Sequence, residues 1–216
     1  AAALADDLGA LAGARVQKVV AVDARTLCLE LYAGERHHLI LSAAPDHPGL
    51  ALAAGPPRRG TGAPGPLAEA CRARLDGARL AAVVQPPFER ILHLEWKAAA
   101  PLTLVAELTG RLANLILVDA DGTVVAAAHR VTADQSRART VQPGRPYAPP
   151  PTPPKPPAAA ATAADLAAWL SARPGAPAWR VLVDAARGVG PQTAREAVHR
   201  AEGDAAAAAA ATDAAA

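Results

Sequence analysis

The sequence of 216 residues contains no methionine, two cysteines and only 3% aromatic residues. The absence of methionine, including an initiator, suggests that the sequence is a fragment of a longer protein. Cys28 and Cys71 lie in separate apolar stretches without the spacing of a zinc motif, which predicts two buried, reduced thiols. The sequence shows no signal peptide and, apart from Ala tracts, no charge-free run long enough to span a membrane. We therefore expect a cytoplasmic protein without membrane contact.

The composition predicts a core of small aliphatic side chains. Hydrophobic residues make up 51% of the chain and are mostly Ala, Leu and Val, so Trp96, Trp169 and Trp179 are rare large side chains. The formal net charge of +2 is too small to indicate nucleic-acid binding, but residues 53–155 contain 13 Lys or Arg and 8 Asp or Glu. Arginine suits bidentate phosphate contacts, although an arginine-rich genome would give the same excess.

Apolar spacing predicts an α+β fold, with a β-sandwich-like domain of about eight strands followed by a small helical domain. Helices are expected near residues 4–11 and at 66–75, where Pro66 and Gly77 mark the start and stop. A loop is expected over residues 53–65. The expected strands cover residues 15–22, 26–32, 37–42, 78–84, 91–96, 102–108, 115–118 and 123–128.

Seven prolines between residues 149 and 157 predict an extended linker between two domains. The expected parts are a first domain (1–147), the linker (148–161), a helical domain (162–204) and an Ala-rich tail (205–216). The helical domain is expected to begin with a capping box at Thr162 and Asp165, and to direct Leu166, Trp169 and Leu170 inward.

The segment Ala186–Ala194 fits a helix-hairpin-helix pattern. Gly188 and Gly190 permit a tight hairpin, and the free N–H groups of the following helix offer a possible phosphate-binding site. A plain helix–helix turn with Pro191 at the first helical position fits the same residues.

Catalysis finds little support in the sequence. The adjacent His37 and His38 point to opposite faces of a strand and cannot share a metal. In an extended strand Glu89 and Glu95 would lie about 20 Å apart, which is too far for them to act together as a general acid and a general base. We expect no catalytic residues, no metal and no cofactor, and therefore a binding protein and not an enzyme.

Six arginines in one third of the chain favour nucleic-acid binding. In an extended backbone Arg137 and Arg139 would face the same side, so that their guanidinium groups could follow the phosphates of a strand. An ordinary solvated surface would carry the same residues. The six are Arg90, Arg111, Arg130, Arg137, Arg139 and Arg145.

The centre of the chain resembles the NFACT family, which includes bacterial RqcH, the FbpA proteins labelled as fibronectin-binding and eukaryotic NEMF. The resemblance begins with Gln85 and Glu89-Arg90-Ile91 and continues with Glu107-Leu108-Thr109-Gly110-Arg111-Leu112-Ala113-Asn114-Leu115-Ile116-Leu117. Glu89, Leu112 and Ala113 stand where the family pattern has Asp, His and Ser. It continues through His129-Arg130-Val131, Ser136-Arg137-Ala138-Arg139, Pro143-Gly144, Tyr147 and Pro149-Pro150 to Lys155.

The resemblance implies a first domain like the N-terminal domain of formamidopyrimidine-DNA glycosylases, followed by a helix-hairpin-helix domain. It implies a role in ribosome-associated quality control. Such a protein binds the obstructed large ribosomal subunit carrying peptidyl-tRNA and recruits tRNA for template-free addition of C-terminal Ala residues. The tRNA-binding dyad maps to Glu89 and Arg90, and Gly110 and Arg111 map to the same face, while Asn114 is expected to cap a strand end.

Two other functions stay open. A fibronectin-binding surface adhesin follows from the family's label, and the missing signal peptide argues against it. A DNA glycosylase follows from the expected fold alone. That activity needs an N-terminal Pro followed by Glu, where this sequence has Ala1-Ala2-Ala3.

Overall fold

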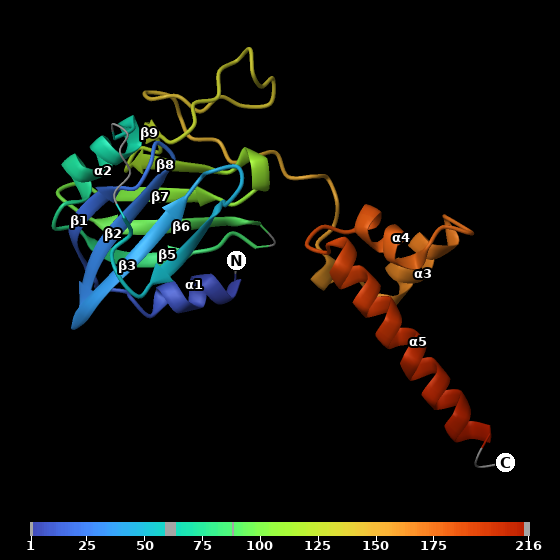
Figure 1. Cartoon of the computed structure of the whole chain (residues 1–216). Helices are drawn as coiled ribbons and strands as arrows, with labels where there is room; N and C mark the ends of the chain where they lie inside the picture. Colours follow the sequence, from blue (N-terminus) through green and yellow to red (C-terminus); the bar gives the residue numbers. More distant parts are fainter. Residues whose placement is uncertain (1, 59–63, 88, 214–216) are drawn as a thin grey trace. The chain divides into compact units, whose positions relative to one another are not determined.

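The computed structural model describes residues 2–58, 64–87 and 89–213 and divides into two compact units, residues 1–151 and 152–216 (Figure 1). The first unit is α+β, as predicted. Its elements are α1 (Ala2–Gly9), β1 (Arg15–Ala21), β2 (Thr26–Ala33), β3 (Glu35–Ser42), β4 (Gly49–Ala53), α2 (Pro66–Leu75), β5 (Arg79–Val84), β6 (Ile91–Lys97), β7 (Leu102–Glu107), the 3₁₀ helix η1 (Gly110–Leu112), β8 (Asn114–Asp119) and β9 (Val124–Ala127).

The nine strands described in this unit form one sheet in the order β4-β3-β2-β1-β5-β6-β7-β8-β9, and each strand is antiparallel to its neighbours. β3 also contacts β8, so the two halves of the sheet face each other across a shared core. Helix α2 packs on β1, β8 and β9. This curved sheet confirms the predicted sandwich-like domain.

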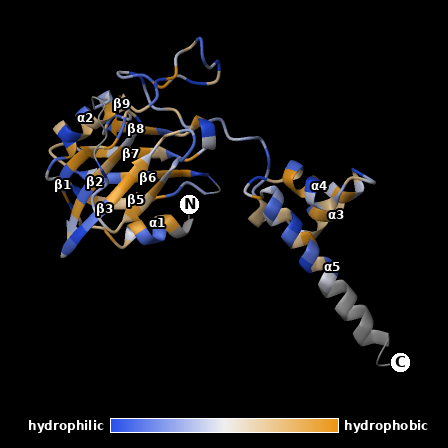
Figure 2. Cartoon of the chain, viewed as in Figure 1, coloured by the Kyte–Doolittle hydropathy of each residue, from blue (hydrophilic) through white to orange (hydrophobic). Residues whose placement is uncertain are grey.

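The main core lies between the two halves of the sheet. It joins leucines from β2 and β3, such as Leu29 and Leu41, to Leu94, Leu104 and Leu117 from the other half. Figure 2 shows the hydrophobic colouring concentrated on these strands. Both cysteine side chains are fully buried and free, which confirms the predicted buried thiols.

The continuous apolar run of β8 is explained by a second cluster on the opposite face of the sheet. Leu115 and Leu117 point into the main core, while Ile116 and Val118 point into the second cluster, so both faces of the strand are buried. The second cluster consists of Ile91, Val105, Ile116, Val118, Val124, Ala127 and Val141.

The sequence prediction missed β4, which pairs with β3 along residues Gly49–Ala53. This strand reads Gly-Leu-Ala-Leu-Ala and lacks the β-branched and aromatic residues that favour strands. The predicted loop 53–65 therefore begins at the end of a ninth strand, and its residues 59–63 lie outside the described residues.

The second unit contains η2 (Ala158–Ala160), α3 (Ala163–Ser171), α4 (Ala178–Ala185) and α5 (Pro191–Asp213). Thr162 and Asp165 form the predicted capping box at the start of α3. The inward placement predicted for Leu166 and Leu170 is wrong, because these side chains are 36% and 41% exposed. They line an open apolar groove between α3, α4 and α5. Helix α5 continues through the predicted Ala-rich tail as far as Asp213.

Part of the predicted linker 148–161 is held by the second unit. The Arg187 N–H donates to the Pro156 carbonyl and the Ala158 N–H donates to the Arg187 carbonyl, both at 2.9 Å. The Lys155 Nζ donates to the Val183 carbonyl at 3.1 Å. Residues 155–158 therefore belong to the helical unit, and the division between the units falls after Pro151.

Candidate nucleic-acid interface

β5 and β7 end, and β6 and β8 begin, on the same side of the sheet. The two motifs that carry the family resemblance, residues 85–91 and 107–117, therefore lie close together. β6 begins where β7 ends, with Ile91 opposite Glu107, and the Leu108 N–H donates to the Arg90 carbonyl at 2.7 Å. β8 begins at the same edge, with Asn114 opposite Glu107. We name this side of the sheet the rim and define it as residues 85–87, 89–90, 108–113 and 129–130.

The first rim segment is a turn between β5 and β6. The Gln85 Nε2 donates to the Glu89 carbonyl at 2.7 Å, and the Glu89 N–H donates to the Pro86 carbonyl at 3.1 Å. Proline contributes no N–H to a strand ladder, so the chain leaves the sheet here. The Arg90 side chain is exposed beside this turn, and Glu89 is partly buried.

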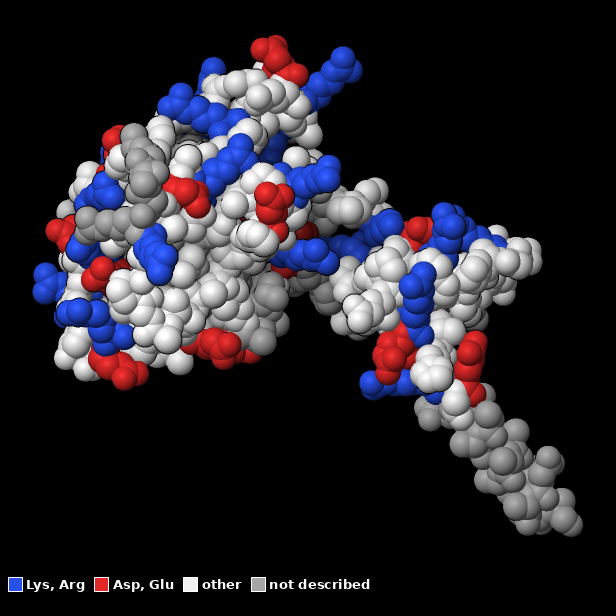
Figure 3. All heavy atoms as spheres, viewed as in Figure 1, with Lys and Arg blue, Asp and Glu red and all other residues white. Residues whose placement is uncertain are grey.

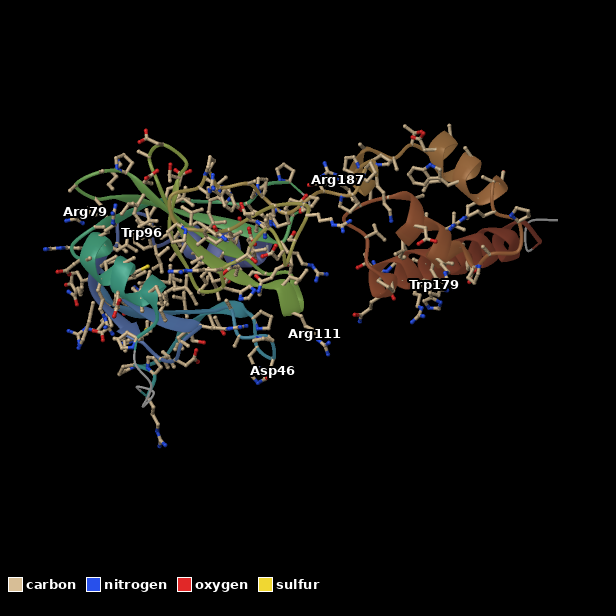
Figure 4. The ribbon with its side chains drawn as sticks, turned by 90° about the horizontal axis from the view of Figure 1, so that it is seen from above. Asp46, Arg79, Trp96, Arg111, Trp179 and Arg187 are labelled. Atoms are coloured by element: carbon tan, nitrogen blue, oxygen red, sulfur yellow. The ribbon has the colours of Figure 1, made fainter. Side chains whose placement is uncertain are left out.

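The second rim segment turns through η1. Gly110 has φ +66, a conformation that side-chain-bearing residues rarely adopt, and the turn closes with the Ala113 N–H donating to the Gly110 carbonyl. Arg111 is exposed, and Figure 4 shows its side chain directed away from the sheet. Leu112 is 78% exposed beside it. The turn therefore presents a cationic and an aliphatic side chain together.

Asn114 fixes the third rim segment. Its buried side chain donates to the His129 carbonyl at 2.7 Å and accepts from the His129 N–H at 2.9 Å. These bonds tie the start of β8 to the chain that leaves β9. The exposed Arg130 follows directly.

A long irregular segment, residues 130–147, follows the rim and covers the outer face of β6 to β9. We name it the arginine loop. Val131 and Val141 close it with two backbone hydrogen bonds of 3.0 and 2.8 Å. Val141 is fully buried in the second cluster, against which Val131 and Tyr147 also pack. Figure 3 shows Lys and Arg side chains gathered over the β8–β9 side of this unit.

A buried ion pair anchors the arginine loop. The Arg139 Nη1 and Nη2 atoms donate to the two carboxylate oxygens of Glu107, each at 2.6 Å, and the Glu107 side chain is fully buried. The Tyr147 hydroxyl donates to Glu107 at 2.9 Å. The Arg139 Nη1 also donates to the Ala148 carbonyl at 2.8 Å. One carboxylate thus holds two points of the loop.

Burial and the negative charge of Glu107 shift the pKa values of Tyr147, Arg139 and His93. Burial raises the pKa of Tyr147 above 10.0, and the neighbouring Glu107 carboxylate raises it further. Burial acts to lower the pKa of Arg139, but hydrogen bonding and charge from Glu107 outweigh it and raise that pKa. Burial lowers the pKa of His93 below 6.5, against the opposing effect of Glu95 and Glu107.

The structure separates the predicted site arginines into two groups. The side chains of one group are exposed and make no ion pair or hydrogen bond to a described residue; these are Arg90, Arg111, Arg137 and Arg145. Arg139 instead has its guanidinium on Glu107. The predicted shared face of Arg137 and Arg139 is wrong, because the chain bends at residues 137–138 and is not extended.

The predicted phosphate hairpin of the second unit joins α4 to α5. Gly188 has φ +85, and α5 begins at Pro191, with the Ala194 N–H donating to the Gly190 carbonyl at 2.9 Å. The Arg195 guanidinium lies 4.3 Å from the centre of the Trp179 ring, a cation–π contact. A shallow hollow beside it is lined by Pro191, Gln192, Thr193, Arg195, Glu196 and His199.

Sequence reasoning missed Glu107 and Leu112 as contributors to this region. The signal for Glu107 was one acidic residue at the end of an otherwise apolar strand, since a charge in such a position needs a partner. Within the described residues, His, Cys, Asp and Glu side chains form no group that could hold a metal ion. No helix in the described part of the chain is long and apolar enough to cross a membrane.

The fold is similar to solved structures of proteins named for fibronectin or fibrinogen binding. The N-terminal domain of the fibronectin-binding protein PavA from Streptococcus pneumoniae matches with a TM-score of 0.82 and 23% identity, over 96% of this chain and 80% of that chain. The N-terminal part of the fibronectin/fibrinogen-binding protein of Streptococcus suis gives 0.74 and 25%, over 88% and 73%. The fibrinogen-binding protein of Staphylococcus aureus gives 0.75 and 24%, over 91% and 71%.

Comparison of the sequence with curated proteins gives no match. The family model for NFACT N-terminal and middle domains matches residues 1–216. This match covers the motifs of the rim, the arginine loop and the helical unit alike. The chain therefore belongs to the NFACT family, and the match lies in the family's N-terminal and middle domains.

Proposed function

We propose that this chain is the tRNA-binding part of a ribosome-associated quality-control factor. The protein binds the obstructed large ribosomal subunit that carries peptidyl-tRNA. It recruits tRNA for the template-free addition of C-terminal Ala residues. The chain binds and positions tRNA without catalysing a reaction itself. It acts on the ribosome, in the cytoplasm.

The exposed Arg90 and Arg111 on the rim carry this proposal. Their motif segments are joined by the hydrogen bond between Leu108 and Arg90, and both guanidinium groups are available to an external partner. Guanidinium groups bind phosphate oxygens in a bidentate manner. The exposed Leu112 beside them can pack on a ribose or a base.

The arginine loop extends this surface, and the helical unit offers an anion site of its own. Arg137 and Arg145 are exposed on the loop, where they can contact phosphates beyond those held by the rim. In the helical unit, the turn at Gly188 and Gly190 leads into the N-terminus of α5, whose amide groups favour an anion. Exposed arginines on both the rim and the arginine loop suit a long RNA ligand more than a small molecule.

Sedimentation of the full-length protein with ribosomal subunits tests this function. Lysates of cells expressing the wild-type protein or the double variant Arg90→Ala/Arg111→Ala would be fractionated, and the bound tRNA would be sequenced. We expect the wild type to sediment with large subunits and to retain tRNA, and the double variant to lose the tRNA. A wild-type protein that never sediments with large subunits would overturn the proposal.

Fibronectin binding is the second candidate, because two of the similar structures belong to proteins named for it. Immobilised fibronectin would be tested with the same purified wild type and double variant. Saturable binding of fibronectin by a protein that binds no tRNA would favour this candidate.

A further inference from the structure

The arginine loop carries the exposed Arg137 and Arg145, and Glu107 is the buried charge beneath the loop. We infer that Glu107 is a positioning residue for RNA binding, which holds the arginine loop so that Arg137 faces the ligand. This inference rests on the proposed function and assigns a role to a residue that does not touch the ligand.

Glu107 connects the middle of the loop, at Arg139, to its end at Tyr147. Glu107 sits at the end of β7 with no exposed side-chain surface, and it receives two hydrogen bonds from Arg139 and one from Tyr147. Arg139 lies near the middle of the loop, and Tyr147 is its last residue. Between them, Val141 is buried and paired with Val131.

The exposed arginines sit directly beside these anchors. Arg137 is two residues before Arg139, and Arg145 is two residues before Tyr147. Backbone hydrogen bonds to Gly122 and Val124 hold residues 144–147. Arg137 has no helix or regular strand of its own to fix its position, so it depends most on the anchor at Arg139. A loop that must be ordered on binding loses affinity through conformational entropy, whereas an anchored loop does not.

Charge and position predict opposite effects when Glu107 is neutralised. Through charge alone, removal of a carboxylate near a phosphate-binding surface strengthens RNA binding, because like charges repel. Through position, the same change releases Arg139 and loosens the loop, so RNA binding weakens. The sign of the change in affinity therefore distinguishes a positioning role from a simple electrostatic one.

The test compares Glu107→Gln with Asp134→Asn. Asp134 is exposed in the same loop, and its removal changes the charge equally without breaking a hydrogen bond to a described residue. Each purified chain would be titrated into fluorescently labelled total tRNA, and amide hydrogen exchange would be followed at Val131 and Val141. Circular dichroism would establish that each variant is folded at the temperature used.

For Glu107→Gln we expect faster exchange at both valines and a weaker affinity. The apparent Kd rises about tenfold if the docked loop falls to about a tenth of the population. Asp134→Asn should bind tRNA as well as the wild type or slightly better. Unchanged or tighter binding by a folded Glu107→Gln, while the wild type binds tRNA, would overturn the inference and leave the proposed function intact.

Tyr147→Phe is the second variant, for use if Glu107→Gln does not fold. It removes one hydrogen bond to Glu107 and leaves the charge of the chain unchanged. A loss of tRNA affinity smaller than that expected for Glu107→Gln supports the positioning role. An unaltered tRNA affinity contradicts it. A wild-type chain that binds no tRNA would overturn the proposed function and this inference together.

Discussion

Arg139 donates one hydrogen bond from each terminal nitrogen to the two carboxylate oxygens of Glu107, 32 residues earlier in the chain. The bidentate pair connects the end of β7 to an irregular loop. Because Glu107 is fully buried and Arg139 is only 12% exposed, water can replace few of these bonds.

Arg139→Ala should therefore destabilise the first unit strongly. It leaves the Glu107 carboxylate buried with only Tyr147 as a partner, and loss of one member of a buried pair costs about 3–5 kcal/mol. Thermal or urea unfolding followed by circular dichroism measures the change. Arg137→Ala removes an exposed arginine two positions away and should shift stability by no more than about 0.5 kcal/mol. Equal stability of the two variants would show that the pair contributes nothing.

His93 should make stability depend on pH below neutrality. Burial lowers its pKa in the folded chain below 6.5, so the unfolded chain binds more protons between the two pKa values. Stability contributed by neutral His93 is thus complete above pH 6.5 and declines as the pH falls through that window. Urea unfolding at a series of pH values should show a smaller decline for His93→Gln than for the wild type. His199→Gln, at an exposed position of α5, serves as the control; an identical decline in all three chains would contradict the prediction.

A chain that ends at Pro151 should fold by itself, whereas one that ends at Pro146 should be less stable. The shorter chain loses the Tyr147 hydroxyl bond to Glu107 and the 2.8 Å bond from the Tyr147 N–H to the Gly122 carbonyl. Each such bond contributes about 0.5–1.5 kcal/mol. Thermal unfolding of the two truncated chains would measure the difference. If the chain of residues 1–151 does not fold, the first unit is not independent.

Local sequence patterns predicted most elements of the first unit, with β4 as the exception, because those elements follow from neighbouring residues. The alternation of Ile91, Leu94 and Trp96 among polar residues located β6, and the apolar run at Leu115 located β8. The pattern could not show why β8 is apolar on both faces, since this depends on Val141 and the rest of the arginine loop.

The candidate site was predicted in part. The motifs located Arg90 and Arg111, and the structure places both, exposed, at one rim. The role of Arg139 could not be predicted, because its partner lies 32 residues away and the bend at residues 137–138 has no strong sequence signal. The exposure of Leu166 and Leu170 could not be predicted either, because helical spacing defines an apolar face but does not show whether another element covers that face.

The most direct test of the account is the tRNA affinity of Arg90→Ala compared with Lys97→Ala. Both side chains are exposed and belong to the same strand region, but Lys97 ends β6 while Arg90 precedes it at the rim. Loss of one charged hydrogen bond weakens binding by about tenfold to a hundredfold. Fluorescence anisotropy with labelled tRNA should show this loss for Arg90→Ala at an unchanged melting temperature, with wild-type affinity for Lys97→Ala. Equal affinities for the two variants, or a loss that follows unfolding of Arg90→Ala, would contradict the assignment of the rim as the tRNA-binding surface.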